Sequence, residues 1–293
     1  MSAKRVATTV VAVILTGTLV PAAALAKGGG GQQTSVIYSS LVASPLPGNL
    51  PSVGAEAYAF NEFGNGVAFS SSKNRSLSNV VATMSSWGCQ SGTWYSDNCV
   101  TTPGATFSVL ITFNVYDAST DGVHPGALIA TATQTFAIPY RPSASPKCGS
   151  SGKWYDNSLK TCFNGYAVNV TFTFSGQTLP GSVVFGIAYN TTHFGYNPIG
   201  ESAACYTSSG GCGYDSLNIA LSQDPTNVIV GSDTNPGTVW QNSPYGSEYC
   251  DGGTAGTDFF RLDSPNTPSC WGVNFPYNDP PYYVPAVQIK AAG

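Results

Sequence analysis

Apolar and polar residues alternate along much of this chain with the two-residue period of a half-buried β-strand. Between Val168 and Phe174, valine and phenylalanine take every second position, while asparagine and threonine fill the positions between them. A further strand is predicted at residues 284–290, and we expect this closing strand to lie beside the first one. Segments rich in Val, Ile, Thr, Phe and Tyr predict the other strands at residues 35–42, 77–86, 106–116, 127–136, 167–174, 182–189 and 216–221.

Turn-forming residues divide the predicted strands. Glycine and proline gather at residues 45–51, 121–122, 125–126, 180–181 and 235–237. Outside the N-terminal segment, no stretch of ten or more residues shows the 3.6-residue period of an amphipathic helix. Many short strands separated by such turns indicate the all-β class, and we expect a single β-sandwich that is jelly-roll-like.

The first 26 residues have the pattern of a signal peptide. Lys4 and Arg5 supply a positive start, residues 6–20 form an uncharged apolar run, and Ala24 and Ala26 give a small-x-small cleavage pattern. A permanent membrane anchor is the alternative, but a run of 15 residues is shorter than the roughly 20 that a bilayer core requires. We therefore expect a secreted, extracellular protein with a signal peptide at 1–26, a flexible glycine-rich leader at 27–34 and one β-sandwich domain at 35–293.

Composition limits the classes of partner. Charged residues make up 9% of the chain, and the formal net charge is -4. The sequence has no basic patch, so the counterion release that drives nucleic-acid binding is missing, and we expect no nucleic-acid partner. Hydrophobic residues (42%) and aromatic residues (12%) are abundant enough to form a core, which argues against disorder. After signal cleavage, we expect no insertion into a membrane.

The eight cysteines indicate four disulfide bonds, because their number is even and the chain is predicted to be exported. Zinc binding is the competing use of cysteine. The chain has no Cys-x-x-Cys pair and only two histidines, His124 and His193, which disfavours zinc. Pairing of neighbours in the sequence would close four short loops, by the bridges Cys89–Cys99, Cys148–Cys162, Cys205–Cys212 and Cys250–Cys270.

Two of these cysteine loops carry the same short motif. Ser-Gly-x-Trp-Tyr occurs at residues 91–95 and again at 151–155, and an aspartate and a cysteine follow each copy. Because predicted strands flank both copies, we expect two hairpin-like loops at one end of the sandwich. A ring exposed on such a rigid loop could stack on a sugar while carboxylates take its hydroxyls; alternatively, the tryptophans pack over the disulfides. The candidate glycan-binding residues are Trp94, Tyr95, Asp97, Trp154, Tyr155 and Asp156.

Carboxylates offer two further candidate sites. Asp251, Asp258 and Asp263 cluster around a predicted disulfide loop, and such oxygen ligands suit structural calcium, the one cofactor that we consider. Glycoside hydrolysis needs two suitably placed carboxylates. Glu56 and Glu62 would lie about 20 Å apart on an unbroken strand, which is too far, and a bend is expected beyond them at residues 63–64. The sequence assigns no catalytic residue.

Four segments of the chain are similar to those of a recurrent group of uncharacterised exported bacterial proteins. The segments are PLPGNLPS at 45–52, SSWGCQSG at 85–92, FGIAYNTTH at 185–193 and YCDGG at 249–253. The resemblance spans nearly the whole chain after the signal peptide. It implies a jelly-roll-like extracellular domain, and it brings no established activity or functional residues with it.

These observations favour a secreted protein that binds a glycan, or another cell-surface or matrix component, through its aromatic disulfide loops. An enzyme on the same scaffold, a glycan hydrolase or lyase with paired carboxylates, is the second hypothesis and requires convergent acidic groups in a cleft. A structural surface or assembly subunit is the third hypothesis and requires an unpaired edge strand or a flexible leader.

Overall fold

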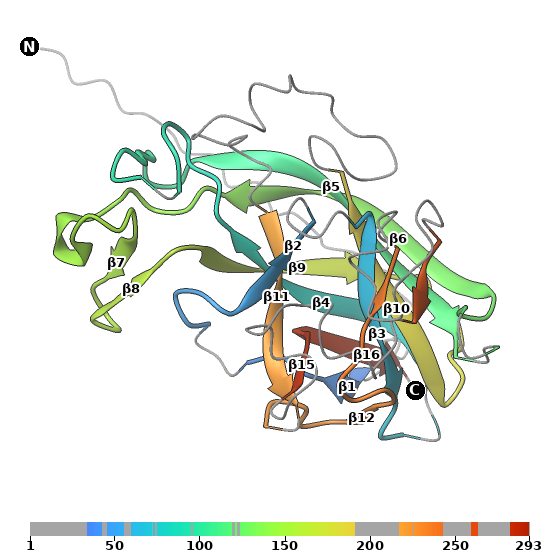
Figure 1. Ribbon diagram of the computed structural model, residues 1–293. Helices are drawn as coiled ribbons and strands as arrows, with labels where there is room; N and C mark the ends of the chain where they lie inside the picture. The colour runs from blue at the N-terminus through green and yellow to red at the C-terminus, as the bar shows by residue number, and fades with distance from the viewer. Residues whose placement is uncertain are drawn as a thin grey trace, which may run out of the picture. The chain divides into compact units, whose positions relative to one another are not determined.

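Strands dominate the part of the chain that the structure describes (Figure 1). The computed structural model describes residues 34–42, 46–55, 60–71, 73, 75–94, 96–118, 121, 124–190, 217–224, 226–242, 259–262 and 282–292. All of them belong to one unit, Gln33–Gly293. The elements are β1 (Thr34–Ser39), β2 (Ser52–Gly54), β3 (Glu62–Ala68), β4 (Ser76–Ser86), β5 (Thr106–Asp117), β6 (Leu128–Pro139), the 3-10 helix η1 (Pro146–Cys148), β7 (Trp154–Asp156), β8 (Thr161–Phe163), β9 (Tyr166–Thr173), β10 (Ser182–Tyr189), β11 (Leu217–Asp224), β12 (Ser232–Asp233), β13 (Trp240–Gln241), β14 (Arg261–Leu262), β15 (Tyr282–Pro285) and β16 (Val287–Ala292).

Eight of these strands pair as one long hairpin that has been rolled up. The nested antiparallel pairs are β1 with β16, β3 with β10, β4 with β9, and β5 with β6. In addition, β16 pairs with β4 and β10 pairs with β5. These two contacts divide the hairpin into sheets with the strand orders β1-β16-β4-β9 and β3-β10-β5-β6. The result is a jelly roll, which confirms the predicted fold, including the placement of the last strand beside the first.

Shorter strands extend both sheets. In the first sheet, β11 pairs with the end of β4, while β2 and β15 pair with β11. In the second sheet, β12 and β13 pair with β3, and β14 pairs with β13. The hairpin of β7 and β8 forms a third, two-stranded sheet.

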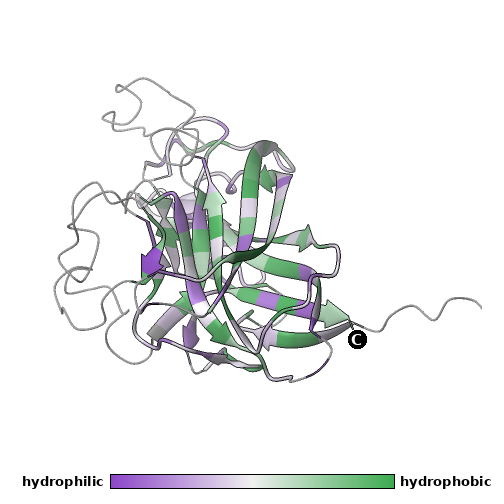
Figure 2. Cartoon of the chain, turned by 90° about the vertical axis from the view of Figure 1, so that its right-hand side faces the viewer, coloured by the Kyte–Doolittle hydropathy of each residue, from purple (hydrophilic) through white to green (hydrophobic). Residues whose placement is uncertain are grey.

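Aromatic side chains fill the space between the two main sheets. Phe172 of β9 lies 5.5 Å from Phe113 of β5 and 5.0 Å from Phe136 of β6, measured between ring centroids. Phe113 in turn stacks on Phe185 of β10 at 5.4 Å. Phe113, Phe172 and Phe185 have no exposed surface. Figure 2 shows the matching alternation of hydrophobic and hydrophilic residues along the strands, which places one face of each sheet in this core.

The segment around Phe63 and Gly64 is a strand, and the bend expected there is wrong. It lies within β3, which pairs with β10 over its whole length. A Cβ atom on Gly64 would lie only 1.7 Å from the Phe185 carbonyl oxygen. The glycine that suggested a bend is therefore needed for the close approach of two strands.

Among the described residues, no helix has the length and apolar character needed to span a membrane.

We expect Gly64→Ala to destabilise the protein strongly, because its methyl group would collide with the backbone of β10. Overpacking typically costs about 1–3 kcal/mol in the free energy of unfolding, and we expect this variant at the upper end of that range because the contact is with backbone. Gly181→Ala is the matched control, since a Cβ atom there meets nothing within 4 Å. Urea unfolding of both variants measures the difference, and equal stabilities would contradict the packing described for β3.

Candidate functional site: a cleft beside two disulfide loops

The two loops with the repeated motif lie together at one end of the sandwich (Figure 1). The first disulfide loop (residues 87–105) joins β4 to β5, and the second disulfide loop (residues 140–165) joins β6 to β9. Cys89–Cys99 closes the first loop and Cys148–Cys162 closes the second, as predicted. Because β5 and β6 form one hairpin, its two ends bring both loops to the same place.

Arg141 joins the two loops. It has no exposed surface, and its guanidinium donates hydrogen bonds to the carbonyl oxygens of Trp94 (2.6 Å) and Gly152. Its backbone N–H donates to the Gly88 carbonyl oxygen at 2.9 Å. Asp97 adds a second link, since its carboxylate accepts a hydrogen bond from the Gly152 N–H at 2.8 Å. Burial lowers the pKa of Arg141 to about 10, so the side chain remains charged at neutral pH.

Trp154 packs inside the second loop, in agreement with the packing alternative and not with the exposed platform. Only 5% of its surface is exposed. Its indole N–H donates to the Gly165 carbonyl oxygen at 2.6 Å, and its ring lies 5.4 Å from that of Phe163 and 5.6 Å from that of Tyr166. The ring and the polar edge of this indole both have neighbours within the protein, so it stabilises the loop.

The other residues of the predicted platform have separate roles. Trp94 is half-buried, and its ring meets that of Trp87 edge-on at 4.8 Å. The Tyr155 ring lies 4.7 Å from the Lys147 ammonium group, a cation–π contact. Asp156 accepts hydrogen bonds from the Ser158 N–H and hydroxyl, which stabilise the turn of the β7–β8 hairpin and lower the pKa of Asp156. Tyr95 lies outside the described residues.

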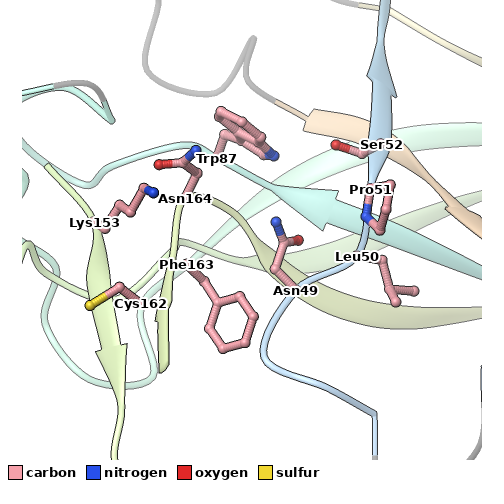
Figure 3. A pocket seen from close by; sticks show the side chains of 9 residues that line it. All are labelled: Asn49, Leu50, Pro51, Ser52, Trp87, Lys153, Cys162, Phe163 and Asn164. Atoms are coloured by element: carbon pink, nitrogen blue, oxygen red, sulfur yellow. The ribbon is translucent and has the colours of Figure 1, made fainter. Parts of the chain in front are cut away.

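A cleft of about 380 Å³ opens beside the second disulfide loop (Figure 3). Residues 49–52 form one wall, and the second loop forms the other. Trp87, which begins the first loop, closes one end. The lining residues are Asn49, Leu50, Pro51, Ser52, Trp87, Lys153, Cys162, Phe163 and Asn164.

Trp87 is held in the cleft wall by Ser85 and Gly165. Its indole N–H donates to the Ser85 hydroxyl at 2.9 Å, and that hydroxyl donates to Asn49 Oδ1 at 2.6 Å. Gly165 lies so close that a Cβ atom there would come within 2.4 Å of the indole nitrogen. The ring is half-buried, so its position is fixed while part of its surface remains accessible.

Several polar groups in the cleft make no hydrogen bond within the described residues. They are the Asn164 side-chain amide, the Asn49 NH₂ group and the Lys153 ammonium group. Asn164 and Lys153 are both partly exposed. The cleft thus combines the ring surfaces of Trp87 and Phe163 with unoccupied donors and acceptors, the combination that small-molecule sites use for affinity and orientation.

A second hollow of about 400 Å³ lies where the first loop meets β5 and β6, and it differs in character. Pro103, Pro139, Pro142, Tyr140 and Tyr166 line much of it, and no charged residue is among the described residues around it. It offers fewer polar groups for the recognition of a hydroxyl-rich ligand. We therefore take the Trp87 cleft as the candidate site.

Glu62 is hydrogen-bonded within the second sheet. It is 1% exposed, and its carboxylate accepts hydrogen bonds from the Asn114 NH₂ group at 2.9 Å and the Tyr116 hydroxyl at 3.0 Å. These bonds connect β3 with β5 across β10. Glu56, the second carboxylate considered for glycoside hydrolysis, lies outside the described residues.

The remaining predicted site residues also lie outside the described residues. They are the candidate calcium ligands Asp251, Asp258 and Asp263, and the cysteines Cys205, Cys212, Cys250 and Cys270. Both assignments stay predictions.

Fold and site together define a jelly-roll β-sandwich whose paired disulfide loops border an aromatic and polar cleft. Searches of protein-family models, curated proteins and solved structures found no match to the chain.

We expect Arg141→Met to loosen both disulfide loops at once, because a partly buried carbonyl oxygen in one loop and a buried one in the other lose this donor. Each unsatisfied group costs about 1–3 kcal/mol. Hydrogen exchange measured by mass spectrometry should become faster in peptides from both loops. Lys73→Met, at an exposed position, should leave exchange unchanged. Faster exchange in one loop alone would contradict the role of Arg141 as a shared link.

Non-reducing peptide mapping tests the two bridges that lie outside the described residues. We expect linked peptides for Cys205–Cys212 and Cys250–Cys270, in addition to the bridges of the two described loops. Local pairing is expected because neighbouring cysteines meet most readily in the unfolded chain. A crossed pair, such as one joining residues 205 and 250, would overturn the scheme.

Proposed function

We propose that this protein is secreted and binds a glycan in the Trp87 cleft. The observation that carries the proposal is the fixed, partly accessible indole of Trp87 in the same cleft as the unpaired polar groups of Asn164 and Lys153. A pyranose ring has an apolar face that stacks on an indole, and it has hydroxyl groups at its rim that require hydrogen-bonding partners. The cleft supplies both kinds of contact side by side.

The rigidity of the cleft also supports binding. Its walls are held by the Cys148–Cys162 bridge, by the hydrogen bond from Trp87 to Ser85 and by the link through Arg141. A site that is already ordered loses little conformational entropy when the ligand arrives. Gly48 tightens the wall further, since a Cβ atom there would lie 2.5 Å from the Phe163 ring.

Lys153 favours an acidic glycan. It is the only charged residue among the described residues that line the cleft. An ammonium group beside a stacking ring can pair with the carboxylate of a uronic acid, and hydrogen bonds of this charged kind are stronger than neutral ones. The proposed ligand class is therefore a uronic-acid polysaccharide.

Binding suits the cleft better than hydrolysis does. Its described lining contains no aspartate or glutamate, whereas glycoside hydrolases use a pair of carboxyl groups on either side of the scissile bond. The two described disulfides support an oxidising location, because such bonds persist mainly in exported proteins.

Affinity electrophoresis in gels that contain polygalacturonate or alginate tests the proposal, with cellulose-derived oligosaccharides as neutral probes. We expect Trp87→Ala to weaken retardation by tenfold or more, because the stacking surface is removed. Lys153→Gln should weaken binding to the acidic polymers about tenfold, which corresponds to about 1.4 kcal/mol. The affinity of the same variant for the neutral probes should stay close to that of the wild type.

Two substitutions in the same loop serve as matched controls. Lys160→Gln removes an equal charge from an exposed position, and Leu159→Ala removes apolar surface from a side chain that is 49% exposed. Both should bind as the wild type does. If the wild-type protein binds none of the polymers, or if Lys160→Gln matches Lys153→Gln in its effect, the proposal is wrong.

A further inference from the structure

Strand β6 forms one edge of the second sheet, and no strand in the described part of the chain pairs with its outer side. It pairs with β5 along its inner side, and it comes last in the strand order β14-β13-β3-β10-β5-β6. The free edge of a strand presents a row of N–H and C=O groups that can pair with a strand of another chain.

The hydrogen bonds to β5 show which backbone groups of β6 point outward. The Tyr140 N–H donates to the Ala105 carbonyl oxygen at 3.1 Å, and these two residues continue the β5–β6 register by one position. Backbone groups alternate in direction along a strand, so the even-numbered residues from 132 to 138 direct theirs toward β5. The odd-numbered residues direct theirs away from the sheet, and all four of them are exposed: Thr131, Thr133, Thr135 and Ala137.

The features that usually protect a sheet edge are missing from most of β6. The strand has 12 residues, whereas the other edge strands described, such as β1 and β9, have eight or fewer. No charged residue lies between residues 128 and 139, and the one proline of the strand is its last residue, Pro139. The β-bulge in the β5–β6 pair lies at the other end, beside Leu128. The segment between these ends is therefore open to pairing.

We propose that β6 is a dimerisation surface, on which β6 of a second copy of this chain pairs in antiparallel orientation about a two-fold axis at Gln134. In this register Thr131 lies opposite Ala137 of the second copy, and Thr133 lies opposite Thr135. Every pair joins two residues whose backbone groups point outward, so each can form hydrogen bonds across the axis. The two sheets would then continue as one, in the order β5-β6-β6-β5.

The edge of β6 suits a second copy of itself. Two-fold pairing brings no like charges together, because the strand has none, and it places threonine opposite threonine, a cross-strand pair that stabilises a sheet. Pro139, which has no N–H to donate, follows Gln134 by five residues. Ile129, which the bulge leaves without a partner in β5, precedes Gln134 by five. Both limits of regular pairing are thus equally far from the proposed axis, as a symmetric contact between identical surfaces requires.

Sedimentation equilibrium of the purified protein tests this interface. We expect the wild type to be a dimer at about 100 µM and to dissociate on dilution. Thr135→Lys should weaken dimerisation about tenfold or more, because the ammonium groups of the two copies would become diagonal neighbours across the axis. Thr171→Lys is the matched control, since it adds the same charge at an exposed position of β9, and it should dimerise as the wild type does.

Thr135→Pro gives a second test if Thr135→Lys does not retain the circular dichroism spectrum of the wild type. Proline is tolerated on an edge strand where the N–H faces solvent, so the β5–β6 pair should remain while the dimer is lost. A wild-type protein that stays monomeric at about 100 µM, equal effects of the lysines at positions 135 and 171, or a dimer that persists in Thr135→Pro would overturn the proposal.

Cysteine cross-linking tests the register. Gln134 lies opposite Gln134 of the second copy in a non-hydrogen-bonded pair, whose Cα atoms are about 4.5 Å apart, within the range of a disulfide. Gln134→Cys should therefore form a covalent dimer on mild oxidation, visible on a non-reducing gel. Ala137→Cys should not, since its counterpart in the second copy is residue 131. The reverse pattern would contradict the proposed pairing. Glycan binding at the Trp87 cleft is measured separately, so the two proposals can fail independently.

Discussion

The geometry of the candidate site depends on one buried cation, the guanidinium of Arg141. Two loops that are separate in sequence present carbonyl oxygens to it, from Trp94 and Gly152. The Gly152 oxygen is buried and requires a donor, and the Trp94 oxygen is partly buried, so Arg141 stabilises both loops in this arrangement. Because Arg141 is the second residue after the end of β6, the position of the loops is fixed relative to the sandwich itself.

Much of the fold could be predicted because the strands of a sandwich reveal their buried face by alternation. The predicted segment at 182–189 coincides with β10, and the segment at 167–174 differs from β9 by one residue at each end. The strand β3 was missed because Gly64 was interpreted locally as a bend, and its neighbour Gly66 was not considered. Their presence reflects the proximity of β10 and of residues 234–240, which no local pattern contains. Strands of two residues, such as β12 and β13, are too short to show a period.

The candidate site could be predicted in part. Cysteine spacing and the repeated motif indicated two tied loops at one end, and the structure places them there. The same motif, however, gives two tryptophans with different surroundings: Trp154 meets Phe163 and Tyr166, whereas Trp94 meets Trp87. Trp87 itself was not among the site residues predicted from the sequence. Its position two residues before a predicted disulfide was the available signal, but its accessibility depends on the glycine at 165, far along the chain.

The rolled hairpin has a consequence for how the molecule is made. Residue 34 pairs with residue 292, so the first and last strands complete one sheet together. Contacts between such distant positions form late and slowly, and a nascent chain cannot close its sheet until its final strand is available. A chain that ends before β16 would leave the edges of β1 and β4 without partners. A chain that contains β16 can therefore complete this sheet, whereas a truncated chain without β16 cannot.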